Sequence, residues 1–121
     1  MDESAESFDV AKILFDKEKY LEAAFFCNLA CEKILKAAIV EFVSIIPPKI
    51  HPLTRLAQLS NIDQQMSASQ IKFLNRLEVF QIESRYPQDR SKLYASTPIM
   101  VFQEILVETE AFLLWIRKQL P

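Results

Sequence analysis

The stretch YLEAAFFCNLACEKILKAAIVEFVSI, from Tyr20 to Ile45, decides the fold of this chain. Its apolar residues recur at intervals of three and four positions, which places them on one face of an α-helix. Asn28 is the one polar member of that series. Further apolar residues lie off this stripe, at Phe26, Leu29, Ala30, Ala37, Ile39 and Val40. A helix that is apolar on more than one side is predicted to lie at the centre of a helical bundle, or at a dimer interface.

Three more long helices and one short helix are predicted around this stretch. The long helices cover about 4–16, 68–84 and 98–119, and the short helix covers about 51–59. Pro47–Pro48 ends the central helix because proline lacks the N–H that a helix needs. Ser67, followed three residues later by Gln70, resembles a capping box at the start of the third long helix. Residues 60–63 are predicted to be a loop and residues 85–91 a bend.

The chain of 121 residues contains no glycine. Glycine normally supplies the positive-φ positions of hairpin turns, so the composition argues against an all-β fold. Phosphate-binding loops of the Walker or Rossmann type are excluded, because they need glycine where the backbone meets the phosphate. The length suits one domain. The sequence therefore predicts a single all-α domain over 1–121, an antiparallel up-and-down bundle of four long helices and one short helix.

Charge and the first residues bear on the cellular setting. The formal net charge is −2, so the chain as a whole does not attract nucleic acid. No apolar run reaches about 18 residues, the length that spans a membrane. The acidic start Met1-Asp2-Glu3 is the opposite of the basic start of a signal peptide. We expect a soluble, cytoplasmic protein with no membrane association and no cofactor.

Two cysteines, Cys27 and Cys31, lie four residues apart on the central helix. Zinc takes four ligands in structural sites, and the chain contains a single histidine, His51. We therefore predict no metal site, and we expect both cysteines to be small buried residues of the core.

The segment Glu83 to Arg90 is the predicted ligand-binding site. Arg85-Tyr86-Pro87 lies at its centre, between two helical stretches. The Arg85 guanidinium can grip a phosphate with two hydrogen bonds, Arg90 adds a second cation, and Tyr86 can stack on a base. In the alternative interpretation, Arg85 only pairs with a nearby carboxylate or carbonyl, and Tyr86 packs against the bundle.

His51 and Lys36 are two further predicted ligand contacts. His51 could act as an acid, a base or a phosphate contact, or it could only cap the short helix. Lys36 could face a groove beside Arg85. Alternatively, it forms an exposed ion pair with Glu32, four residues earlier on the same helix. No catalytic residue is predicted.

The order of three motifs resembles the HEPN domain family, over about 8–117. The motifs are Ala30-Cys31-Glu32-Lys33-Ile34-Leu35-Lys36-Ala37, His51-Pro52-Leu53 and Arg85-Tyr86-Pro87. The resemblance implies a bundle of four or five helices that is often dimeric. Many members of the family cut RNA with an arginine that is followed four to six residues later by a histidine. No histidine follows Arg85 here, so the resemblance implies the branch with Arg-Tyr-Pro, which the family links to nucleotide binding.

The predicted function is that of a non-catalytic HEPN-like module that binds a nucleotide or another phosphate-bearing ligand. The resemblance also implies a homodimer in a prokaryotic two-component system of the toxin–antitoxin type, with a minimal nucleotidyltransferase as partner. One alternative is an RNA endonuclease toxin with an atypical site that uses His51 and Arg85. Another is a structural protein whose apolar central helix mediates dimerisation.

Overall fold

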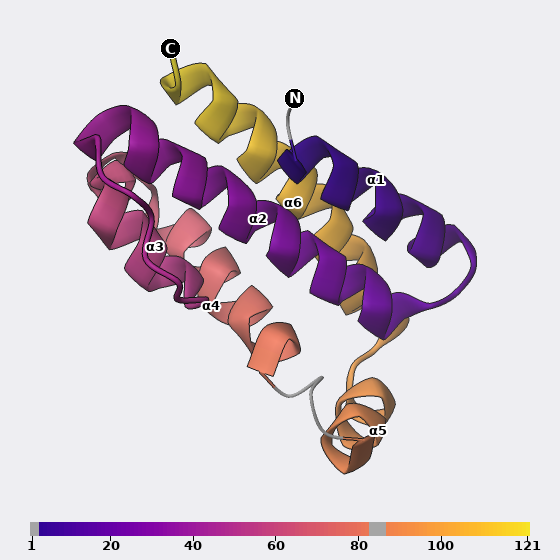
Figure 1. Ribbon diagram of the computed structural model, residues 1–121. Helices are drawn as coiled ribbons and strands as arrows, with labels where there is room; N and C mark the ends of the chain where they lie inside the picture. The colour runs from indigo at the N-terminus through magenta and orange to yellow at the C-terminus, as the bar shows by residue number, and fades with distance from the viewer. Residues whose placement is uncertain (1–2, 83–86) are drawn as a thin grey trace.

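A computed structural model of the chain describes residues 3–82 and 87–121. This part of the chain is helical and contains no strand (Figure 1). Its elements are α1 (Glu3–Asp16), α2 (Tyr20–Val43), α3 (Leu53–Ser60), the 3₁₀ helix η1 (Ile62–Gln65), α4 (Ala68–Ile82), α5 (Pro87–Ser96) and α6 (Ile99–Gln119). The all-α class is confirmed.

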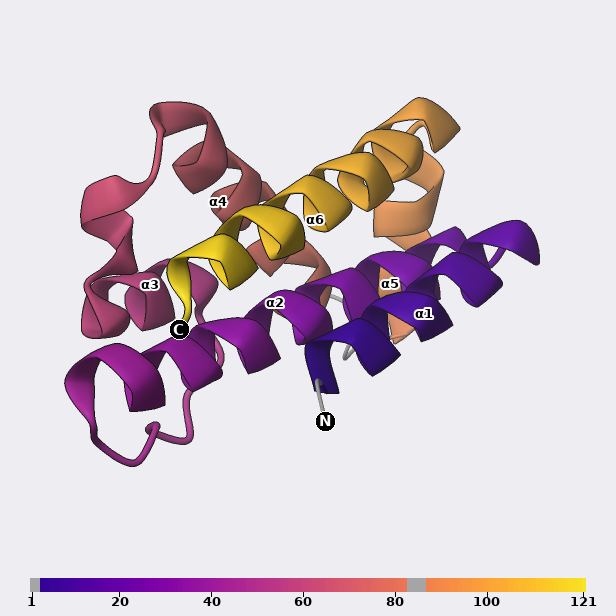
Figure 2. The ribbon, with the colours of Figure 1, turned by 90° about the horizontal axis from the view of Figure 1, so that it is seen from above.

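The helix α2 is the centre of the bundle, as predicted. It contacts each of the other α-helices. Figure 1 shows α1 and α4 running opposite to α2 and α6, which is the up-and-down arrangement. Seen from above in Figure 2, α3 and α5 lie toward opposite ends of α2. The core therefore surrounds α2, and the two short outer helices cover different parts of its length.

Asn28 interrupts the apolar stripe of α2 because it ties α2 to α4. Its side chain is fully buried, and its Nδ2 donates a hydrogen bond of 3.2 Å to the carbonyl oxygen of Leu77. A buried amide needs such a partner, since an unpaired polar group in the core is destabilising. The polar residue thus fixes where α4 sits on the central helix.

The helix ends follow the predicted signals closely. The capping box is present: the Ser67 amide donates to Gln70 Oε1 at 2.8 Å, and the Gln70 amide donates to Ser67 Oγ at 3.2 Å. The helix α2 ends at Val43, two residues earlier than predicted, and Ser44 adopts a left-handed φ of 61°. Because the chain lacks glycine, non-glycine residues fill such positions at helix ends.

Two predictions about loops are wrong. Residues 87–91 were predicted to belong to a bend, but they form the first half of α5. Pro87 is compatible with this helix because it occupies the first position, where a helix needs no donor from its backbone. Residues 60–63 were predicted to be a loop, but Ser60 ends α3 and Ile62 begins η1. Ile62 is buried, so apolar burial favours a compact turn there.

In the part of the chain that the structure describes, no helix combines the length and the apolar character needed to cross a membrane.

Candidate functional site

An open groove lies between the start of α2 and the helix α5. Its walls are formed by Leu21 and Glu22 of α2 and by Arg90, Ser91 and Tyr94 of α5. Its volume is about 420 Å³, which falls within the range of roughly 300–1,000 Å³ found for small-molecule sites. The groove brings together two segments that are almost seventy residues apart in the sequence.

The residues of α5 face the groove because of their helical spacing. Arg90 and Tyr94 are four residues apart, so their side chains lie on the same side of the helix, one turn from each other.

Leu93 attaches α5 to the core, since it is the buried residue among positions 90–96. The Thr97 hydroxyl donates a hydrogen bond of 2.6 Å to the Leu93 carbonyl, which closes the last turn of the helix.

Tyr94 is held in place by an aromatic cluster centred on Phe102 of α6. The ring centroids of Tyr94 and Phe102 are 6.4 Å apart. Tyr20 of α2 stacks on Phe102 at 5.7 Å, and Phe80 of α4 packs against it at the same distance. Such pairs add to the stability gained from burying the rings. The Tyr94 ring is therefore held by its aromatic neighbours while the residue stays 49% exposed.

Arg90 forms an ion pair with Glu22 across the groove. The distance from Arg90 Nη2 to Glu22 Oε1 is 3.7 Å, and the two side chains are 43% and 41% exposed. An ion pair with this exposure contributes about 1 kcal/mol or less. The guanidinium is therefore able to exchange this partner for a more highly charged anion.

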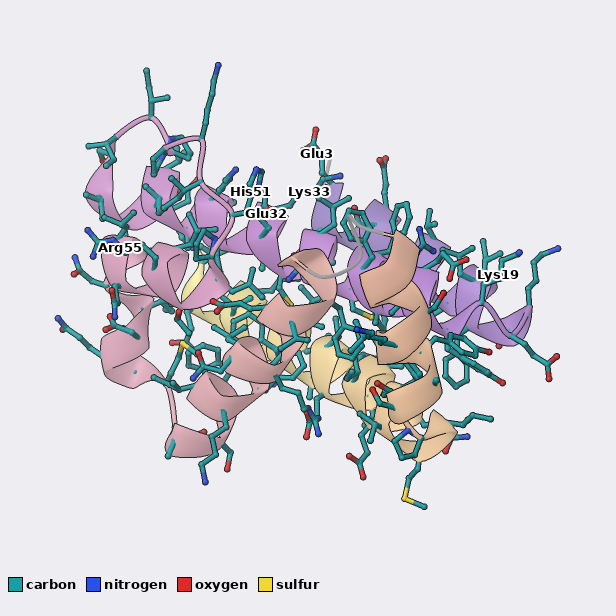
Figure 3. The ribbon with its side chains drawn as sticks, turned by 90° about the horizontal axis from the view of Figure 1, so that it is seen from below. Glu3, Lys19, Glu32, Lys33, His51 and Arg55 are labelled. Carbon is teal, nitrogen blue, oxygen red and sulfur yellow. The ribbon has the colours of Figure 1, made fainter. Side chains whose placement is uncertain are left out.

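A second polar cluster is centred on Glu32 of α2. The Glu32 side chain is only 9% exposed. Its Oε2 is 3.1 Å from Lys36 Nζ, and its Oε1 is 3.1 Å from His51 Nδ1. Figure 3 shows Glu32 and His51 close together, with Lys33 nearby. The predicted ion pair between Lys36 and Glu32 is present, but it is partly buried and not exposed as expected.

The backbone next to His51 is fixed by a carboxylate from α4. Pro52 is the N-cap of α3 and makes no side-chain cap. Instead, Glu78 Oε1 accepts hydrogen bonds from the Thr54 amide at 2.8 Å and from the Thr54 hydroxyl at 3.0 Å. A carboxylate at a helix N-terminus accepts hydrogen bonds from the free amides of the helix and interacts favourably with the helix dipole. His51 is thus positioned by α3 and by Glu32 together.

The predicted site residues fall into separate places. Lys36 and His51 meet at Glu32, whereas Arg90 lines the groove with Glu22. Lys36 is fourteen residues after Glu22 on one helix, a separation of about 20 Å at the rise of an α-helix. Arg85 and Tyr86 lie outside the described residues.

Sequence reasoning missed Glu22, Ser91 and Tyr94 as residues of the groove. Arg90 and Tyr94 carry a usable signal, since residues four apart share a face once α5 is known to be a helix. No sequence pattern indicates that Glu22 belongs to the groove, because only the packing of α5 against α2 brings it near Arg90.

Cys27 and Cys31 are buried free thiols, as expected. Burial raises the pKa of Cys27 to about 12, and a hydrogen bond with Thr109 opposes this rise. Burial also raises the pKa of Cys31 well above its usual value. Among residues 3–82 and 87–121, no group of three or more His, Cys, Asp or Glu side chains is placed to hold a metal ion.

Comparison with known proteins identifies the family. The model of the HEPN domain matches residues 1–119. No curated protein and no solved structure matches the chain. The family match spans nearly the full sequence and agrees with the all-α bundle, in which the central helix carries the first motif. This chain belongs to the HEPN domain family.

Proposed function

We propose that this HEPN domain is a non-catalytic binding module for a nucleotide or another phosphate-bearing ligand, and that the groove between α2 and α5 holds the ligand. The observation that carries the proposal is the convergence of Arg90, Ser91 and Tyr94 on one wall of that groove. The first two offer hydrogen-bond donors, and the third offers an aromatic ring.

Two of these groups suit a phosphate, and the third suits a base. A guanidinium binds phosphate oxygens with two parallel hydrogen bonds. A serine hydroxyl can donate a further hydrogen bond to the phosphate. Stacking of a base on an aromatic side chain is worth about 1–3 kcal/mol. The ligand must displace Glu22 from Arg90, which costs about 1 kcal/mol or less because the ion pair is exposed.

Titration calorimetry with AMP, ADP and ATP tests the proposal. The wild-type chain is expected to bind, and Arg90→Ala is expected to lose at least about tenfold in affinity, since a hydrogen-bonded charge pair contributes about 1.5–3 kcal/mol. Lys92→Ala is the matched control, because Lys92 carries the same charge on the same helix and is exposed outside the groove. Absence of binding by the wild type, or equal losses in the two variants, would contradict the proposal.

A second candidate function, RNA cleavage at an atypical HEPN site, is favoured by the contact between His51 and Glu32. A histidine whose Nδ1–H donates to a carboxylate keeps Nε2 as a proton acceptor, which is the arrangement of a general base. The His51 side chain is 51% exposed, so substrate could reach it. Incubation of structured RNA with wild type and His51→Ala tests this candidate: a lack of products that depend on His51 would eliminate it.

The partner and the assembly are part of the same proposal. Membership of the HEPN family supports a homodimer and a minimal nucleotidyltransferase as partner in a toxin–antitoxin-like system. Light scattering after gel filtration measures the mass of the particle in solution. Co-purification with the product of the neighbouring gene tests the partner, and a neighbour without a nucleotidyltransferase fold would contradict this part.

A further inference from the structure

The proposed nucleotide groove contains one acidic side chain that a pure phosphate site would not need. Glu22 lines the groove directly opposite Arg90. A carboxylate beside a phosphate weakens binding through repulsion between like charges. Its presence in the groove therefore points to a group on the ligand that a carboxylate can recognise.

A carboxylate at neutral pH only accepts hydrogen bonds. The hydroxyl groups of a ribose are donors, and a carboxylate that accepts from them forms strong, charge-assisted hydrogen bonds. Dinucleotide-binding folds use an acidic residue for the ribose hydroxyl in the same chemical role. The cationic and aromatic groups of the groove leave the ribose as the part of a nucleotide that lacks a partner.

We propose that the groove selects ribonucleotides over deoxyribonucleotides and that Glu22 is the residue that recognises the ribose. This inference rests on the proposed function of the groove. In the free protein Glu22 pairs with Arg90. In the complex Arg90 turns to the phosphate and Glu22 accepts from the 2′-hydroxyl of the ribose. The ion pair is thus exchanged for two separate interactions with one ligand.

Glu22, Arg90 and Tyr94 all line the same groove, and in a nucleotide the ribose connects the phosphate to the base. Glu22 and Arg90 approach to 3.7 Å from opposite walls. Tyr94 follows Arg90 by one turn of α5, which is about 6 Å along the helix. The proposed phosphate and base contacts on α5 are therefore about one helical turn apart, and the proposed ribose contact, Glu22, lies across the groove from Arg90.

The test compares AMP with 2′-deoxy-AMP, which differ by one hydroxyl, in titration calorimetry of the folded chain. Wild type is expected to bind AMP about tenfold more tightly than 2′-deoxy-AMP, because one hydrogen bond to a charged group has an effect of this size. In Glu22→Ala this preference is expected to vanish, while the affinity for 2′-deoxy-AMP stays the same or rises because Arg90 is released. Glu41→Ala is the matched control, since Glu41 is an exposed carboxylate near the other end of α2, and it is expected to keep the preference.

The outcomes separate this inference from the function on which it rests. Equal binding of both nucleotides by wild type, with both lost in Arg90→Ala, overturns the role of Glu22 and leaves the phosphate-binding groove intact. A preference for AMP that survives in Glu22→Ala also overturns it. If wild type binds neither nucleotide, the proposed function fails, and this inference fails with it.

Discussion

At the scale of single residues, the polar side chains buried along α2 each have a defined partner. Asn28 bonds the Leu77 carbonyl, and Glu32 bonds Lys36 and His51. In the described part of the chain, no buried side-chain nitrogen or oxygen lacks a hydrogen-bond partner. The sequence reveals that Asn28 breaks the apolar pattern, but it does not reveal the partner, because Leu77 is 49 positions away.

Asn28→Ala is expected to lower the free energy of unfolding by about 1–3 kcal/mol, because it removes the bond to Leu77 and leaves an unfilled space. Urea denaturation followed by circular dichroism measures the change. The control is Asn75→Ala, which removes an exposed amide from α4. Similar losses in the two variants would show that the buried hydrogen bond is unimportant.

The raised pKa of Cys27 predicts a loss of stability at high pH. Its pKa is 9.0 in an ordinary environment and about 12 in the folded chain. The neutral thiol is favoured by folding, so its stabilising contribution is complete below pH 9 and is lost as the pH rises toward 12. Melting temperatures from pH 8 to pH 11 should fall more steeply in wild type than in Cys27→Ala.

At pH 8, a thiol reagent should modify Cys27 and Cys31 only after unfolding. Rapid labelling of the folded chain would be inconsistent with the burial of these thiols.

At the scale of elements, the described side chains of α5, those of residues 90–96, are mostly exposed. Among residues 90–96, Leu93 alone is buried, and the ion pair to Glu22 and the ring contact to Phe102 supply its other described contacts. The longer helices were predicted because their apolar residues repeat with the helical period. The helix α5 has no such stripe, so the sequence pattern indicated only a bend.

Leu93→Ala is expected to detach α5 without unfolding the bundle. The change removes the one buried side chain among residues 90–96, at a cost of about 2 kcal/mol for a residue at the rim of the core. Amide hydrogen exchange should accelerate in residues 90–96 while the amides in the middle of α2 keep their protection. Lys92→Ala serves as the control, and unchanged exchange in α5 would show that other contacts hold the helix.

The turns of this glycine-free chain offer a stabilising substitution. Glu18, between α1 and α2, has a φ of 62°, a left-handed conformation that costs most residues about 1–2 kcal/mol. Glu18→Gly is expected to raise the free energy of unfolding by up to about 1 kcal/mol, because part of the gain is offset by the greater freedom of glycine in the unfolded chain. Asn61→Gly, at a φ of 65°, should gain less, since asparagine tolerates this region. Thermal melts of both variants test whether Glu18→Gly gains more stability than Asn61→Gly.

At the scale of the whole molecule, the bundle and its family were predictable, whereas the site was only partly so. Periodicity, prolines and the missing glycine all describe local structure, and they define the helices and their class. The groove depends on contacts between Glu22 and Arg90, and the Glu32 cluster depends on the path of the chain from α2 to α3. Such contacts between distant residues leave no mark in a local pattern.

A ligand that binds the folded chain alone should stabilise the entire bundle. At a concentration 100 times its Kd, a nucleotide adds about 2.7 kcal/mol to the free energy of unfolding. AMP is therefore expected to raise the melting temperature of wild type and of Lys92→Ala, and to leave that of Arg90→Ala nearly unchanged. An equal rise in all three proteins would place the bound nucleotide elsewhere.

The hydrogen bonds from Thr54 to Glu78 couple two helices into one cooperative unit. The Thr54 amide, in the first turn of α3, and the Thr54 hydroxyl both donate to a carboxylate of α4, so α3 cannot separate from α4 without breaking both bonds. Local opening of the bundle should therefore release α3 and α4 together. The Thr54 amide becomes a natural reporter of that event: its exchange rate measures how often this half of the molecule opens while α1 and α2 remain packed.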